Sequence, residues 1–229
     1  MLCPDQKACP GPPDLPGSHG EHLLQERQGS ASRARAFYHK QMLDYLNPFM
    51  QEFIGRQEMF FLASADSRGE CDCSFRAGDP GFVRVLGDRT LAYPELRGNG
   101  VYASLGNILE NAHVGMLFVD FFRDTIGLHV NGKARVLSPK EVERWDHPLV
   151  SGCRVSGGGR VPELWVVVDV KEAYVHCAKH IPLLARLSKE IDWGTDEPRQ
   201  KGGDYFHAKG CARPWAGPAP YGTGPQGRP

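Results

Sequence analysis

The feature that most constrains the fold is a run of short apolar β-type segments that follow one another almost without interruption. They lie at residues 59–65, 70–75, 82–86, 90–93, 113–119 and 125–137, and a last segment runs over 164–170 and 173–177. Only one helix-like segment, residues 101–110, stands among them. Because the strands do not alternate with helices, a doubly wound sheet is excluded and neighbouring strands are expected to pair antiparallel. We predict a mainly β (α+β) fold, a six- to seven-stranded antiparallel Greek-key barrel with peripheral helices.

Helices are predicted on both sides of this run. Residues 31–54 have apolar side chains at helical spacing, and Asn47-Pro48 divides them into two helices, since Asn is a good N-cap and Pro fits the first helical position. Ser138-Pro139-Lys140-Glu141 is a capping box that begins a helix over about 139–146. A short helix is expected over 178–187. Asn131-Gly132 is either a hairpin turn or a bulge in one bent strand.

The ends of the chain differ from its middle. Residues 1–20 and 208–229 are rich in Pro and Gly and lack apolar periodicity, so we expect both to be disordered tails. Between them we expect N-terminal helices over 21–56 and a barrel over 57–187. The polar, Gly-broken segment 188–207 is either a surface tail or a lid or dimer-contact segment.

Composition excludes several classes of function. Twenty-seven basic and 27 acidic residues leave no net charge, so we expect no nucleic-acid partner. No window has about 18 consecutive apolar residues, and the first residues lack the apolar stretch of a signal peptide, so we expect a cytoplasmic protein without a membrane partner. Seven Cys without paired spacings argue against a disulfide framework. Cys71 and Cys73 are interpreted as buried or edge thiols rather than metal ligands, and no metal is expected.

Two polar segments are candidates for a phosphate site. Ser74-Phe75-Arg76 ends a strand, and Arg97-Gly98-Asn99-Gly100 leads into the internal helix. Two Arg and a hydroxyl at a helix N-terminus would suit a phosphate, although a solvated turn explains the same spacing. His176 and Cys177 point to opposite faces of a strand, which favours a ligand-contact or structural role over a nucleophilic pair.

The motifs together carry a family resemblance. The segments "PGFVRVLGDRTLAYP", "RGN…L.NILEN..VG.LF" and "HVNGKARV" resemble the pyridoxamine 5'-phosphate oxidase-like FMN-binding split-barrel flavoproteins, over residues 59–137 and 164–180. The resemblance implies a homodimer with FMN at the interface and one bent strand with a bulge at Gly132. The site residues that it implies are Ser74, Arg76, Arg97 and Asn99 at the phosphate, Ala92, Tyr93 and Pro94 at the isoalloxazine ring, and Ser104 and Asn107 at the phosphate or the partner's flavin.

The resemblance also implies a type of chemistry. An FMN-dependent oxidoreductase would pass hydride between the flavin and a small-molecule substrate, so no side-chain nucleophile is required. His176, Lys179 and Trp193 are predicted to shape the substrate side. The Ser-Arg-Lys of the pyridoxal-phosphate-forming oxidases is replaced by Arg97-Gly98-Asn99, which argues against that reaction. A non-catalytic flavin store or redox sensor, and a haem-binding split barrel with His176 or His180 at the iron, are the alternatives.

Overall fold

The computed structural model describes residues 15–144, 161–213 and 215. The chain divides into two compact units, Met1–Gly194 and Thr195–Pro229. Every helix and strand named below belongs to the first unit. In the second, the described residues form turns without a helix or strand, and Lys201 pairs with Asp196 at 2.7 Å.

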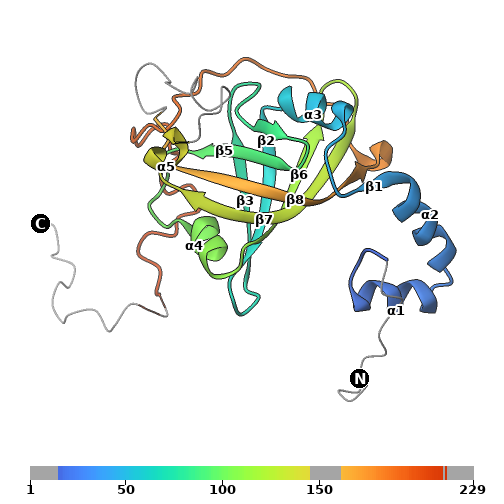
Figure 1. The fold of residues 1–229 in the computed structure, drawn as a ribbon. Helices are drawn as coiled ribbons and strands as arrows, with labels where there is room; N and C mark the ends of the chain where they lie inside the picture. The colour runs from blue at the N-terminus through green and yellow to red at the C-terminus, as the bar shows by residue number, and fades with distance from the viewer. Residues whose placement is uncertain (1–14, 145–160, 214, 216–229) are drawn as a thin grey trace, which may run out of the picture. The chain divides into compact units, whose positions relative to one another are not determined.

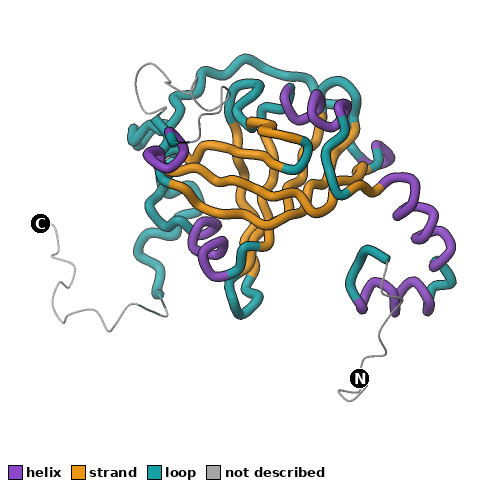
Figure 2. The backbone as a smooth tube through the Cα atoms, in the orientation of Figure 1, coloured by secondary structure: helices purple, strands orange, loops and turns teal. Residues whose placement is uncertain are grey.

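The first unit is built on one antiparallel sheet of eight strands that curls into a barrel (Figures 1 and 2). The strand order is β3-β2-β6-β7-β8-β5-β4, and the two-residue β1 also pairs with β8. The end strands β3 and β4 are not paired with each other, so the barrel is split between them. The bounds are β1 Met42–Leu43, β2 Met59–Ala65, β3 Cys71–Ala77, β4 Arg84–Gly87, β5 Thr90–Glu95, β6 His113–Asp120, β7 Ile126–Leu137 and β8 Leu164–His176.

The predicted strands are confirmed, and one more is present. The two halves of the last segment form the single strand β8, and the additional strand is β1. The long segment 126–137 is one strand, because β7 pairs with β8 on both sides of an irregularity at Asn131/Gly132. Gly132 suits this position, since a Cβ there would collide with the carbonyl oxygen of Asp169 on β8. The bulge interpretation is therefore confirmed and the hairpin interpretation is wrong.

The helices agree with the sequence where caps define them. Asn47 accepts from the Met50 amide at 3.0 Å and begins α3, Pro48–Gly55. Ser138 and Glu141 form the capping box of α5, Pro139–Glu143. The internal helix is α4, Ala103–Glu110.

Three helix predictions need correction. The helix expected from residue 31 ends at Gln41, because the chain turns into β1; this helix is α2, Ala31–Gln41. A further helix, α1 (His19–Arg27), has the capping box of Ser18 and Glu21 and begins inside the segment expected to be a disordered tail. Residues 178–187 contain only a single 3-10 turn, Ala178–His180, instead of a short helix. The segment 151–160, whose Gly and Ser content predicts a loop, and most of the two predicted tails lie outside the described residues.

The core fills the interior of the barrel. Phe60 of β2 contacts Tyr93 of β5 edge-on at 5.0 Å and Phe118 of β6 at 5.2 Å between ring centroids. All three rings are fully buried, together with aliphatic side chains of β2, β7 and β8. Within the described part of the chain, no helix is long and apolar enough to cross a bilayer.

Candidate functional site

A cavity of about 570 Å³ opens at the split of the barrel. Its walls come from the end of β3, the end of β5, the turn that leads into α4, and the segment around Trp193. These segments are far apart in the sequence, yet they bring seven of the predicted site residues to one place: Ser74, Arg76, Pro94, Arg97, Asn99, Ser104 and Trp193. The volume lies in the ordinary range of small-molecule sites.

One wall of the cavity carries a triangle of hydrogen-bonded polar side chains, Asp72, Ser74 and Ser104. The Ser74 hydroxyl donates to Oδ2 of Asp72 at 2.6 Å, and the Ser104 hydroxyl donates to the same oxygen at 2.9 Å. The two serine oxygens are 2.9 Å apart. The Ser74 hydroxyl above all, and then the Ser104 hydroxyl and the charge of Arg76, hold the pKa of Asp72 below its usual value against the effect of burial. Asp72 is therefore an ionised carboxylate at neutral pH.

A second charged pair crosses the split. Nε of Arg76 on β3 donates to Oε1 of Glu95 on β5 at 2.7 Å, and both side chains are mostly buried. Burial raises the pKa of Glu95, and the nearby Arg76 guanidinium opposes that shift. Because β3 and β5 are not neighbours in the sheet, this pair links the end strand β3 to β5 at the cavity.

The turn before α4 is shaped by its own side chains. Oδ1 of Asn99 accepts from the Val101 amide at 3.0 Å, which is a local Asx turn, and Gly100 follows with φ +78°. Tyr102 has a left-handed conformation, φ 54°, which is uncommon for a bulky residue. Its hydroxyl donates to Glu163 at 2.8 Å, and no side chain caps the N-terminus of α4. The solvated-turn interpretation thus explains the side-chain contact of Asn99, but not the placement of Arg76 and Ser104 on the wall of one cavity.

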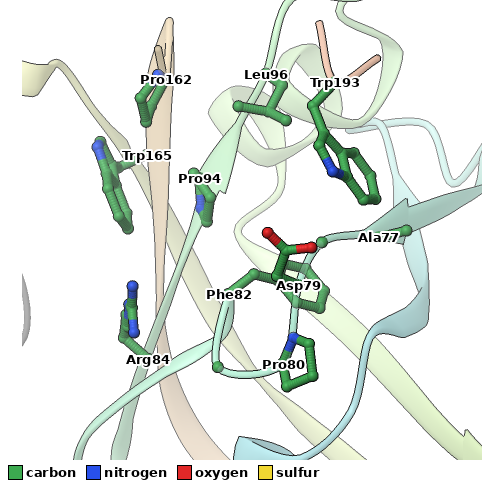
Figure 3. A pocket seen from close by; sticks show the side chains of 12 residues that line it. Ala77, Asp79, Pro80, Phe82, Arg84, Pro94, Leu96, Pro162, Trp165 and Trp193 are labelled. Atoms are coloured by element: carbon green, nitrogen blue, oxygen red, sulfur yellow. The ribbon is translucent and has the colours of Figure 1, made fainter. Parts of the chain in front are cut away.

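A smaller cavity of about 140 Å³ adjoins the larger one. Figure 3 shows its wall: Pro94, Leu96, Trp165 and Trp193 stand around an opening that Phe82 and Pro80 close from below. Pro94, Leu96 and Trp193 line both cavities. Trp193 is half-buried and supplies a flat apolar surface where a planar ligand could stack.

Five predicted site residues lie elsewhere. Tyr93 and Ala92 are almost fully buried, with Tyr93 inside the barrel core, and neither is among the residues that line the cavity. Asn107 donates to the Ser64 hydroxyl at 3.1 Å. His176 is hydrogen-bonded to His129 of β7 at 3.0 Å between ring nitrogens, and Lys179 is exposed. Neither of them is among the residues that line the cavity, and neither is His180.

Two acidic residues of the cavity were missed. Asp72, Ser74 and Arg76 alternate along β3 and share one face, so strand periodicity could have added Asp72 to the site. Glu95 directly follows Pro94 at the end of β5, but only the folded chain shows that it meets Arg76. Among the described residues, no group of three or more His, Cys, Asp or Glu side chains is arranged to hold a metal ion.

The family model described as pyridoxamine 5'-phosphate oxidase matches residues 46–177, more than half of the chain. The chain belongs to the pyridoxamine 5'-phosphate oxidase family. The matched segment runs from α3 to the end of β8 and contains every strand except β1. Among curated proteins, none matches the chain significantly.

Several solved structures are similar to this family member. HupZ of Group A Streptococcus is 20% identical, with a TM-score of 0.41, over 57% of this chain and 93% of its own. An FMN-binding protein of Syntrophomonas wolfei is 13% identical, with a TM-score of 0.41, over 69% and 97%. HutZ, the haem storage protein of Vibrio cholerae, is 13% identical, with a TM-score of 0.36, over 57% and 94%. Likeness at this level carries no conclusion about the ligand of this chain.

The residues of the cavity fit a flavin with a phosphate group, with one restriction. Trp193 and Pro94 would face the ring, and Arg97, Arg76 and the uncapped start of α4 would face the phosphate. The restriction is charge, because two carboxylates line the cavity beside the two arginines. Asp72 accepts from Ser74 and Ser104, and Glu95 accepts from Arg76.

Proposed function

We propose that this protein is an FMN-dependent oxidoreductase that acts on a small-molecule substrate. The observation that carries the proposal is the cavity at the split, which gathers Arg76, Arg97, Ser104 and Trp193 from separate parts of the chain. Its mixed lining, with an aromatic and Pro wall beside charged and hydroxyl groups, suits a planar ring joined to a polar tail. FMN is such a ligand.

The roles of the residues follow from their placement. Arg97 and Arg76 would neutralise the phosphate, and Trp193 and Pro94 would hold the ring and exclude water from one side of it. A bound flavin supplies hydride transfer. The protein then needs only to bind and orient the flavin and the substrate. The small substrate would enter beside Trp193, where the cavities adjoin.

We also propose that the protein acts as a homodimer. Large apolar side chains of β3, of the turn before α4 and of α4 are exposed in the single chain: Phe75 is 54% exposed, Val101 68% and Leu109 77%. A second copy that covers them would remove apolar surface from water and close the cavity. Light scattering at micromolar concentration is expected to give about twice the mass of 25.3 kDa. A species of 25.3 kDa alone would contradict the dimer.

The cofactor and the activity need separate experiments. The full chain, purified and mixed with FMN, is expected to quench flavin fluorescence and to retain visible flavin absorption after gel filtration. A Soret band from co-purified haem, without flavin binding, would contradict the proposal.

Turnover is tested with NAD(P)H and candidate acceptors. A protein that binds FMN but shows no oxidation with any of them would be a flavin store or sensor.

A further inference from the structure

In the triangle of Asp72, Ser74 and Ser104, neither serine hydroxyl is free to donate a hydrogen bond to a ligand in the cavity. Each serine hydroxyl has one proton, and both hydroxyls point theirs at Oδ2 of Asp72, at 2.6 and 2.9 Å. The two serine oxygens also lie 2.9 Å apart, but with both protons directed at Asp72 none remains for a hydrogen bond between the serines. An approaching ligand therefore meets lone pairs and a carboxylate at this point of the wall, where a phosphate would need donors.

The charged side chains beside the triangle do not supply the missing donors. Nε of Arg76 is bonded to Glu95 at 2.7 Å, and its NH1 donates to the Phe75 carbonyl at 3.2 Å. The cavity wall contains Arg76 and Arg97 against Asp72 and Glu95, so the four formal charges cancel. Asp72 itself is held ionised by the two hydroxyls and by Arg76. The Asp72 carboxylate thus occupies the side-chain hydroxyl of Ser104, the second residue of α4.

We propose that Asp72 is a specificity-determining residue that opposes a phosphate group at the serine pair and narrows the preference of the site for FMN over riboflavin. The inference rests on the proposed flavin site. Riboflavin has the same ring and ribityl chain without the phosphate, so Asp72 should affect its binding little. A phosphate dianion close to the carboxylate would be repelled by it in a partly buried cavity.

The test compares two ligands on matched variants of the full chain. FMN and riboflavin are titrated by fluorescence quenching into wild type, Asp72→Asn, and Asp88→Asn as the control. Asp88 is exposed in the β4–β5 turn and does not line the cavity, and its substitution changes the net charge equally. Asp72→Asn is expected to raise FMN affinity about 10- to 100-fold, with riboflavin affinity within about threefold of wild type. The control should change neither.

The pH dependence gives a second readout. The second pKa of a phosphate monoester is near 6, so FMN gains a negative charge as pH rises through about that value. Arg76, Arg97 and Glu95 also line the cavity and act on the phosphate in wild type and variant alike, so the readout is the difference between the two proteins. The ratio of FMN to riboflavin affinity in Asp72→Asn, divided by the same ratio in wild type, should rise from pH 5 to pH 8. Asp72→Ser, shorter and also uncharged, replaces Asp72→Asn if the amide variant does not fold.

The outcomes separate the two proposals. If wild type binds both flavins and Asp72→Asn leaves the ratio of FMN to riboflavin affinity unchanged or lowers it, the role of Asp72 is overturned. The proposed flavin site would still stand. Binding of neither flavin to wild type would overturn the flavin site, and the inference about Asp72 with it. A selective gain in FMN affinity supports both.

Discussion

The two strands of the first hairpin, β2 and β3, present opposite chemistry on the same face. Phe60 pairs with Arg76 across the hairpin, Leu62 with Ser74, and Ser64 with Asp72. On β2 these side chains are buried, and the first two belong to the barrel core. On β3 their partners line the cavity. β2 has sheet neighbours on both sides, whereas β3 ends the sheet, so the core stops at β2 and the site begins one strand further.

Leu62→Ala and Ser74→Ala test this contrast with the largest expected effect. Leu62 is fully buried, so its truncation should lower the free energy of unfolding by about 2–5 kcal/mol through lost burial and a cavity. Ser74→Ala removes one hydrogen bond to Asp72 and should cost about 0.5–1.5 kcal/mol. Urea denaturation measures both. Equal losses would show that β3 belongs to the core as much as β2 does.

Arg97→Ala should weaken FMN binding about 10- to 150-fold, because it removes a charge-assisted contact to the phosphate. For Arg76 the double variant Arg76→Ala/Glu95→Gln is preferable, since the single change would leave a buried carboxylate without its cation. The double variant is expected to lose affinity in the same range. Flavin fluorescence titration gives the constants.

Arg89→Ala is the control for both arginine substitutions. Arg89 lies in the β4–β5 turn, paired with Asp44 at 2.8 Å on the surface, and does not line the cavity. Its substitution should leave FMN affinity unchanged. If Arg97→Ala and the double variant also retain wild-type affinity, the phosphate is held somewhere other than the split.

Trp193→Ala tests the apolar wall of the cavity. Loss of the indole should reduce flavin affinity about 2- to 10-fold, because aromatic stacking contributes about 0.5–1.5 kcal/mol to binding. It should also relieve part of the quenching of flavin fluorescence. Trp215, which is 83% exposed and does not line the cavity, provides the matched control, Trp215→Ala. Equal quenching by wild type and Trp193→Ala would place the ring away from this wall.

The smallest effect is expected at the histidines of β7 and β8, outside the cavity. Burial, and then the charge of His176, lowers the pKa of His129 below its ordinary value of 6.5. The folded chain thus binds this proton less readily than the unfolded chain. Stability that is present above pH 6.5 should be lost as pH falls through the lower folded value. His129→Gln should reduce this loss between pH 7 and 5 in urea titrations, whereas exposed His39→Gln should not.

The fold could be predicted from the sequence because local signals determine most of it. Alternation located the long strands, and the Asn47 and Ser138 caps located α3 and α5. The misses have physical causes. α2 ends early because tertiary pairing of Met42 and Leu43 with β8 overrides helix propensity. Residues 178–187 have helix-compatible composition, but short helices depend on packing and only one turn forms.

The site could be predicted only in part. Ser74, Arg76, Arg97 and Ser104 are polar residues placed at strand and helix ends, so pattern and resemblance together pointed to them. The burial of Tyr93 in the core could not be predicted, because a run of apolar residues at a strand end does not show which face each side chain takes. The pairing of Arg76 with Glu95 depends on how the sheet closes, which no local pattern contains.

Hydrogen–deuterium exchange of the full chain, with and without saturating FMN, tests the central claim most directly. A flavin at the split should slow amide exchange in β3, in residues 94–105 and around Trp193, while peptides that contain His129 and His176 should exchange as before. Protection confined to the histidine region, with β3 and the turn before α4 unchanged, would contradict the account.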